Sequence, residues 1–342
     1  MRFVANCFLV VVLFNGGTRA IALEQTKMQQ TRNRIGLAIH GGAGTIERGK
    51  MTPERESEYR AGLERALAAG YEILKRGGSS LDATEAAVRV LEDDPHFNAG
   101  RGAVFTNAGT NELDAAIMEG NGLKAGAVAT LRHIRNPISL ARMIMEKSPH
   151  VFMAGEGAEA FAVANGVKLV DQKYFYTEER WQALQKVKAA EEAGSGDKKF
   201  IITDEDRHGT VGAVALDKNG NLAAATSTGG TTNKKPGRIG DSPVIGGGTY
   251  ANNATCAVSA TGDGEYFIRA TVAHDLSALM EYRGMKLKEA AQAVLAKVAK
   301  IGGTGGLIAI DREGNIALPF NTSGMYRGHV DPSGKFVIEI YK

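Results

Sequence analysis

The sequence predicts a mixed α/β (α+β) fold in which two β-sheets pack face to face and helices cover both outer surfaces, a four-layer αββα sandwich. Two hairpins are the main support for this prediction. Each combines an apolar strand, a polar turn ending in glycine and a returning strand, and they span 211–225 and 307–318. Between them, residues 268–282 and 287–301 have apolar side chains at helical spacing, which supplies one outer layer.

The N-terminal half supplies the opposite layers. We expect a buried strand over Ile35–Ile39, a tight loop over His40–Gly44 and then a helix that Thr52 caps. Ser80 is placed to cap a second helix, which extends to Leu91. Two further strands and a helix opened by proline are then expected over Glu112–Met118, Gly126–Leu131 and Pro137–Lys147.

Residues 1–22 have the pattern of a secretory signal peptide. Arg2 gives a basic start, the apolar run Cys7–Phe14 is too short to span a membrane, and Ala20-Ile21-Ala22 is a small-x-small cleavage pattern. We therefore expect a secreted or periplasmic protein whose mature chain, residues 23–342, is a single domain.

Composition argues against several classes of function. The net charge is only +3 and there is no block of basic residues, so neither nucleic acid nor a membrane surface is expected as a partner. Cys256 is the single cysteine of the mature chain, which excludes an intramolecular disulfide. No pair of histidines has the spacing of metal ligands, so we expect no catalytic metal.

The pair Gly209-Thr210 is the strongest candidate for chemistry. A threonine hydroxyl inside a chain has no local base, whereas an N-terminal threonine can use its own α-amine, whose pKa is roughly 8. Attack of the Thr210 hydroxyl on the Gly209 carbonyl would cut the chain and expose that amine, and Gly209 has no Cβ to obstruct the attack. The linker-like composition of 194–199 would let the new ends separate. Taken alone, the pair is also compatible with an ordinary turn.

Polar residues beyond the first hairpin are candidates to complete a site. Thr228 is expected on the strand beside Thr210, where its hydroxyl either supports Thr210 or merely suits a β-strand. Arg238 and Asp241 share a loop and could bind both charges of an amino-acid head group, pair with each other or face solvent. Thr261-Gly262 ends a strand before a helix, where exposed N–H groups either suit a developing oxyanion or form a plain turn.

Together these segments resemble the isoaspartyl peptidase/plant-type L-asparaginase family of N-terminal-nucleophile hydrolases. The likeness extends from about Gly36 to Arg327, and its carriers are Ile39–Gly44, Phe97–Gly100, His208–Gly212, Thr226–Gly230, Pro236–Asp241 and Thr261-Gly262. The dipeptide His208-Gly209 before the threonine favours the isoaspartyl peptidase branch over the glycosylasparaginases. The tail Gly328–Lys342 is longer than the family pattern leads us to expect.

The resemblance implies a role for each position. It makes Thr210 the nucleophile after autocleavage between Gly209 and Thr210 into an α subunit, 23–209, and a β subunit, 210–342. Thr228 would orient the Thr210 hydroxyl, and Thr261 with the Gly262 N–H would form the oxyanion hole. The implied substrate-binding groups are Arg238 for the α-carboxylate, Asp241 with the Gly264 carbonyl for the α-amine, and Asn98 in the pocket wall.

The same resemblance implies small-molecule substrates, isoaspartyl dipeptides and L-asparagine, hydrolysed without an organic cofactor through a β-aspartyl-enzyme intermediate. It implies self-association of two αβ units into an (αβ)2 heterotetramer. It also implies a structural sodium ion held by backbone carbonyls of one loop, with candidate residues Leu91, Glu92, Phe97, Ala99 and Arg101. The alternative is a non-catalytic periplasmic amino-acid-binding protein, which would stay one polypeptide. A phosphate-binding enzyme is disfavoured, because the glycine clusters lack a phosphate-loop pattern.

Overall fold

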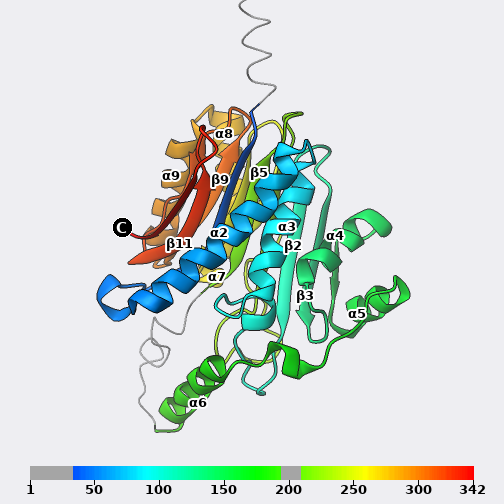
Figure 1. Ribbon diagram of the computed structural model, residues 1–342, viewed down its shortest axis with the longest axis vertical. Helices are drawn as coiled ribbons and strands as arrows, with labels where there is room; N and C mark the ends of the chain where they lie inside the picture. The colour runs from blue at the N-terminus through cyan, green and yellow to red at the C-terminus, as the bar shows by residue number, and fades with distance from the viewer. Residues whose placement is uncertain (1–33, 194–208) are drawn as a thin grey trace, which may run out of the picture.

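The computed structural model describes residues 34–193 and 209–342, which form two β-sheets stacked between helices (Figure 1). The larger sheet has eight strands in the order β12-β11-β1-β5-β6-β2-β3-β4, and only the pair β3 and β4 is parallel. Its strands are β1 (Gly36–Gly44), β2 (Leu113–Glu119), β3 (Ala125–Leu131), β4 (Phe152–Ala154), β5 (Val211–Leu216), β6 (Leu222–Thr228), β11 (Gly324–Val330) and β12 (Phe336–Tyr341). The smaller sheet has the order β10-β9-β8-β7, with β7 (Thr249–Ala251), β8 (Cys256–Gly262), β9 (Gly305–Asp311) and β10 (Ile316–Ala317).

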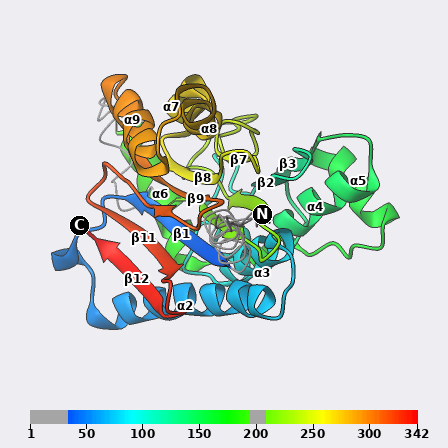
Figure 2. The same ribbon diagram turned by 90° about the horizontal axis from the view of Figure 1, so that it is seen from above.

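Helices cover the outer face of each sheet, and Figure 2 shows the layers edge-on. Those on the larger sheet are α2 (Pro53–Lys75), α3 (Ser80–Asp93), α4 (Pro137–Lys147) and α5 (Gly155–Ala164). Those on the smaller sheet are α7 (Gly264–Ala270), α8 (Val272–Arg283) and α9 (Leu287–Lys300). Helix α6 (Glu178–Glu192) lies apart from both layers at the lower end of Figure 1. The predicted four-layer αββα sandwich is therefore confirmed.

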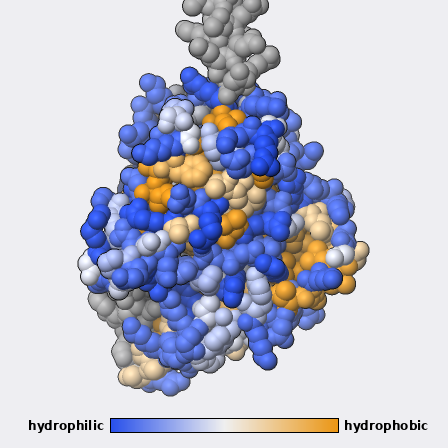
Figure 3. Space-filling view, viewed as in Figure 1, coloured by the Kyte–Doolittle hydropathy of each residue, from blue (hydrophilic) through white to orange (hydrophobic). Residues whose placement is uncertain are grey.

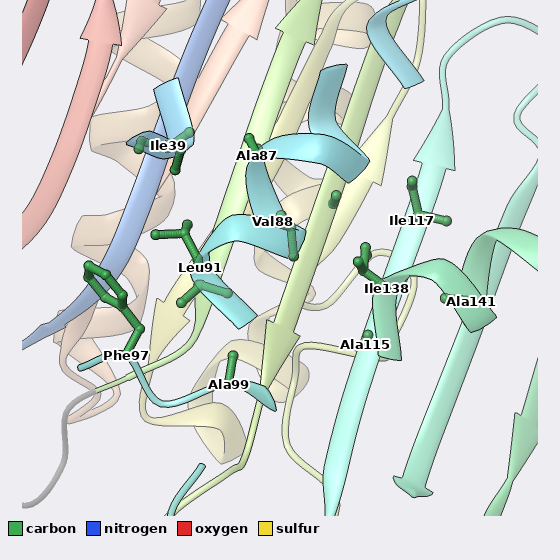
Figure 4. Close-up of a cluster of buried hydrophobic side chains, with 14 of the residues drawn as sticks. Ile39, Ala87, Val88, Leu91, Phe97, Ala99, Ala115, Ile117, Ile138 and Ala141 are labelled. Carbon is green, nitrogen blue, oxygen red and sulfur yellow. The ribbon is translucent and has the colours of Figure 1, made fainter. Parts of the chain in front are cut away.

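Three apolar layers hold the sandwich together, one at each interface. Figure 4 shows the first, where Val88 and Leu91 of α3 point at the larger sheet, which contributes Ile39 and Ile117 to the same cluster. The second, between the sheets, includes Val214, Leu222, Ile308, Ile310 and Met325, and the third, under α8 and α9, includes Val258, Leu276 and Val294. These side chains have no exposed area except Val294, at 1%, so each layer contributes to stability by excluding water.

Both predicted hairpins are confirmed, and they lie in different sheets. Strands β5 and β6 pair from Val211–Ser227 to Leu216–Leu222 in the larger sheet. Strands β9 and β10 pair in the smaller sheet. In the first turn Gly220 has φ of 79° and its N–H donates to the carbonyl of Asp217 at 2.9 Å, which explains the glycine at the end of that turn.

The predicted loop over His40–Gly44 is wrong, because this segment continues β1. His40 pairs with Gly212 of β5 on one side and Arg327 of β11 on the other. The register with β11 shifts between His40 and Gly42, so a β-bulge absorbs the consecutive glycines without ending the strand. The bulge gives Gly42 a φ of +114°, a conformation that glycine adopts without the steric cost of a Cβ.

Two helix boundaries also differ from the sequence expectation. Ser79 rather than Ser80 caps α3, since its hydroxyl accepts the Asp82 N–H at 3.1 Å. The helix expected over 268–282 is broken into α7 and α8 at Thr271, whose φ of 49° is left-handed. The predicted signal peptide and the linker 194–199 lie outside the described residues, and both stay predictions.

The surface is largely polar, with an apolar area over α4 and α5 at the right of Figure 3. Exposed apolar side chains at this end include Val151, Phe152 and Val163, each at least 44% exposed. Within the described ranges, no helix has both the length and the apolar composition required to cross a lipid bilayer.

Replacing Ile308 by alanine is expected to lower the free energy of unfolding by about 2–5 kcal/mol, because it opens a cavity between the sheets. The matched control is Ile301→Ala, at a side chain that is 39% exposed, where the loss should stay within about 0.5 kcal/mol. Urea unfolding followed by circular dichroism measures both. Equal losses for the two variants would contradict the packing described.

Candidate active site

Thr210 lies at the entrance of β5, one residue before the first β5–β6 pair, and is only 6% exposed. Its hydroxyl donates to Thr228 Oγ1 on β6 at 3.2 Å and lies 3.3 Å from Ser242 Oγ. The Thr228 oxygen also accepts the Gly230 N–H at 2.9 Å, which fixes its orientation. Thr228 therefore contacts the Thr210 hydroxyl, as the hairpin register predicts.

Thr210 opens into a cavity of about 240 Å³. This is smaller than the roughly 300–1,000 Å³ of pockets for drug-sized ligands, and so it suits a small molecule. The lining residues come from both sides of the Gly209–Thr210 bond and from three later loops; they are Gly209, Thr210, Thr228, Gly230, Thr231, Arg238, Gly240, Asp241, Ser242, Gly262, Asp263 and Glu265. The candidate nucleophile and both candidate head-group residues thus share one cavity.

Arg238 pairs with Glu265. It does not pair with Asp241 or face solvent alone, the two alternatives to head-group binding that the sequence left open. Its guanidinium donates from Nε to Oε1 at 3.0 Å and from Nη2 to Oε2 at 3.1 Å. The Arg238 side chain is 18% exposed, whereas that of Glu265 is 62% exposed. Burial raises the pKa of Glu265, but the Arg238 guanidinium outweighs this and holds that pKa below its ordinary value. Arg238 is therefore already oriented to bind a carboxylate through two hydrogen bonds.

Asp241 is a buried carboxyl group in the same loop as Arg238. It is 4% exposed, and its Oδ2 has no hydrogen-bond partner in the part of the chain that the structure describes. Burial raises the pKa of Asp241 to about 7, although the Arg238 charge opposes this. An ammonium group bound here would supply the missing partner and favour the charged carboxylate.

Gly264 keeps the space beside these two groups open. A Cβ at this position would lie 3.0 Å from both Arg238 Nη2 and Asp241 Oδ1. The N-terminal end of α7 therefore approaches the head-group residues closely because residue 264 has no side chain.

The backbone around Gly209 is packed between β1 and β8. A Cβ on Gly42 would lie 2.9–3.0 Å from three backbone atoms of Gly209, so the β1 bulge directly contacts the candidate cleavage site. On the other side, a Cβ on Gly209 would lie 2.6 Å from Thr261 Oγ1, which itself accepts the Ala43 N–H at 3.3 Å. Thr261 is fully buried and Gly262 lines the cavity, so the predicted oxyanion pair lies next to Gly209 and Thr210.

Asn98 contacts the backbone of the cavity wall. Its amide Nδ2 donates to the Gly230 carbonyl at 2.7 Å, and its Oδ1 accepts the Val104 N–H at 3.0 Å. Both ends of the carboxamide are thus engaged, and Asn98 holds the Gly230 segment of the cavity wall in place.

In the loop that contains the predicted sodium ligands, backbone carbonyl oxygens lie close to Gly100 and Gly102. A Cβ on Gly102 would collide with the carbonyls of Pro95 and Phe97, and one on Gly100 would collide with the carbonyl of Glu92. Carbonyl oxygens are the donors that hard cations prefer, so this loop fits a sodium ion. In the described ranges, no cluster of three or more acidic, histidine or cysteine side chains forms a metal site.

Three residues in or around the cavity had no role in the sequence interpretation. Ser242 contacts the Thr210 hydroxyl, Glu265 pairs with Arg238, and His40 Nδ1 lies 3.0 Å from the Thr210 carbonyl oxygen. In the sequence, Ser242 directly follows Asp241 and Glu265 directly follows Gly264. Their position next to residues with an expected role is the sequence feature that indicates them. His40 is 170 residues from Thr210 in sequence, and local patterns give no indication of that contact.

Comparison with known proteins gives a consistent result. A family model described as asparaginase matches residues 33–338. The isoaspartyl peptidase of Escherichia coli is 54% identical over 292 residues, which cover 85% of this chain and 91% of the relative. That of Salmonella typhimurium is 53% identical, covering 86% and 95%. The isoaspartyl peptidase/L-asparaginase of Bos taurus is 44% identical, covering 84% and 91%.

The raised pKa of Asp241 predicts a pH-dependent stability cost. The folded-state pKa of about 7 is above the ordinary value of 3.8, so the protonated form of Asp241 stabilises the folded protein. This contribution to stability is complete below about pH 3.8 and is lost as the pH rises through 7. The free energy of unfolding of Asp241→Asn minus that of the wild type should therefore increase between about pH 4 and 7 and level off above. Chemical denaturation across this range measures it. A difference that is constant with pH would contradict the burial of a charged carboxylate.

Proposed function

Because the chain belongs to the asparaginase family, we propose that it is a self-processing amidohydrolase acting on β-aspartyl (isoaspartyl) peptides and on the side-chain amide of L-asparagine. One observation carries the proposal. The Thr210 hydroxyl lies in the same small cavity as the guanidinium of Arg238 and the carboxyl of Asp241. That cavity holds a hydroxyl nucleophile and receptors for both charges of an amino-acid head group.

Substrate binding follows from the charges of the cavity. Arg238 binds the α-carboxylate through its planar fork, and the substrate then replaces Glu265, whose side chain is the more exposed partner of the pair. Asp241 binds the α-ammonium, which supplies the partner that Oδ2 lacks. With the head group held at these two points, the side-chain carbonyl of the substrate is the part left to face Thr210.

Self-processing is the step that we propose precedes turnover. Thr210 Oγ attacks the Gly209 carbonyl carbon, the Oγ–C bond forms and the C–N bond breaks, and the hydroxyl proton passes to the released amine. Water then hydrolyses the ester and leaves Thr210 as a free N-terminus. The close packing of Gly42 and Thr261 around Gly209 supports this step, because it restricts the scissile segment to one position.

Turnover repeats the same chemistry on the substrate. The Thr210 amine takes the hydroxyl proton as Oγ attacks the side-chain carbonyl, and it returns that proton to the departing ammonia or peptide amine. Thr261 and the Gly262 N–H stabilise the negative charge on the oxygen. Water hydrolyses the resulting β-aspartyl ester and regenerates the enzyme.

We extend the proposal to three properties that the sequence predicts: export with loss of residues 1–22, assembly of two αβ units, and a sodium ion in the loop that contains Gly100 and Gly102. The carbonyl oxygens around these two glycines support the last of these. In that role the ion would hold the loop in shape and take no part in catalysis.

Thr210→Ala is expected to leave one uncut polypeptide and to reduce turnover by at least about 1,000-fold, since both steps use the same hydroxyl. Denaturing electrophoresis, N-terminal sequencing and ammonia release from L-asparagine measure these effects. Thr52→Ala, at the distant cap of α2, is the control and should process normally. A wild-type chain that binds aspartate but stays intact and releases no ammonia would instead indicate the amino-acid-binding protein.

Arg238→Lys is expected to raise KM by about 10- to 100-fold, because lysine keeps the charge and loses the two-hydrogen-bond fork. Self-cleavage should proceed at the wild-type rate, as Arg238 does not contact Gly209 or Thr210 through any described hydrogen bond. Steady-state kinetics on matured protein measures the change. An unaltered KM would remove the assigned role of Arg238.

A further inference from the structure

A set of buried polar side chains crosses the otherwise apolar interface between the two sheets. His40 comes from β1 and Thr226 from β6 of the larger sheet, and Thr249 from β7 and Ser259 from β8 of the smaller one. None of the four has any exposed area. Polar groups placed this deep are costly unless they bond one another, so their arrangement calls for an explanation.

The protons of His40 can be assigned from its partners. Nδ1 lies 3.0 Å from the Thr210 carbonyl oxygen, which can only accept, so Nδ1 carries the proton. Burial lowers the pKa of His40 to about 3, so the ring is neutral and Nε2 has no proton. Nε2 therefore accepts the hydroxyl proton of Ser259, whose Oγ is 2.8 Å away.

The remaining hydroxyls continue the set of contacts. Since the Ser259 proton is used, Thr226 donates to Ser259 at 2.7 Å. Thr249 Oγ1 lies 2.6 Å from Thr226 Oγ1, and its single proton has two acceptors, that oxygen and the Ser242 carbonyl. Thr249 Oγ1 is also 3.0 Å from the carbonyl oxygen of Ser242, the residue whose hydroxyl contacts Thr210 Oγ1. The chain of contacts thus starts at the carbonyl of Thr210 and returns to its hydroxyl.

Gly212 gives independent support for this arrangement. It pairs with His40 across β1 and β5, two residues after Thr210. A Cβ at residue 212 would collide with both Ser259 Oγ and His40 Nε2. The absence of a side chain at this position therefore leaves room for the hydrogen bond between His40 and Ser259.

We propose that His40, as a neutral imidazole protonated on Nδ1, is a positioning residue that fixes the backbone of Thr210 for self-cleavage and turnover. The proposal rests on the proposed function, in which Thr210 is the nucleophile. His40 binds the Thr210 carbonyl, and the contacts among the buried hydroxyls connect His40 to the smaller sheet. The same constraint then sets the direction of the Thr210 hydroxyl and, after cleavage, of its amine.

Two substitutions separate the positioning role from simple packing. His40→Asn places an amide N–H near the position of Nδ1 and can still donate to the Thr210 carbonyl, whereas His40→Gln places its amide near Nε2 and cannot. Misplacement of a reacting group by about 1 Å costs roughly 100-fold in rate. His40→Gln should therefore slow processing and lower kcat by about 100-fold, with KM unchanged, and His40→Asn should retain most of both rates.

The control is Cys256→Ala on the same strand as Ser259, because Cys256 is equally buried but packs on the helical side of the smaller sheet. It should lower the melting temperature and leave kcat unchanged. If His40→Asn is as slow as His40→Gln, or if His40→Gln keeps the wild-type kcat, the proposal is wrong.

A measurement on the wild-type chain keeps the proposal testable if the variants fail to fold. Nitrogen-15 NMR of histidine-labelled protein at neutral pH should show His40 with a protonated Nδ1 and an unprotonated Nε2. The opposite tautomer or a charged ring overturns the proposal. A wild-type protein that neither cleaves itself nor releases ammonia would contradict the proposed function instead, whatever the tautomer of His40.

Discussion

The fixed position of Thr210 next to β5 of the larger sheet is the constraint on which the site depends. Its backbone enters β5 in the centre of the larger sheet, and its hydroxyl faces groups supplied from β6 and the loop that contains Ser242. Apolar layers on both sides of each sheet exclude water and make the frame rigid. Within that frame a few polar contacts can hold one residue accurately, since each is satisfied and shielded from solvent.

Glycine residues allow the segments around the site to approach one another closely. Gly42 brings the bulge of β1 against Gly209, and Gly212 leaves space for the His40–Ser259 hydrogen bond. Gly264 keeps the neighbourhood of Arg238 and Asp241 open. Each of these glycines lies where a Cβ would meet a functional or backbone atom, which gives a physical reason for much of the glycine in the motifs. Other glycines, such as Gly220, serve turns alone.

The cavity combines charged side chains with the hydroxyl of Thr210. Arg238 is paired with the exposed carboxylate of Glu265, and Asp241 is buried with one oxygen unpartnered. In the proposed function a zwitterionic ligand resolves both conditions, because its carboxylate takes the place of Glu265 and its ammonium neutralises Asp241. The free protein therefore carries an electrostatic cost at Asp241, and in the proposed function the binding of an amino-acid head group relieves it.

Sequence alone predicted those features that local chemistry determines. Alternating apolar residues and glycine turns placed both hairpins, and Thr52 and Pro137 marked helix starts. The register of β5 and β6 then placed Thr228 beside Thr210. Features that need distant segments were missed: the extension of β1 depends on pairing with β11, and the contact of His40 with Ser259 joins residues 219 apart. The contact of the Asn98 amide with the Gly230 carbonyl, 132 residues away, is another that no local pattern reveals.

The most direct test of the account is to trap the covalent intermediate. Purified protein mixed with L-asparagine and quenched rapidly in acid should yield, in tandem mass spectrometry, a peptide that begins at Thr210 and carries one aspartyl group on the threonine oxygen. An aspartyl group on any other residue, or an active protein in which Thr210 is still joined to Gly209, would contradict it.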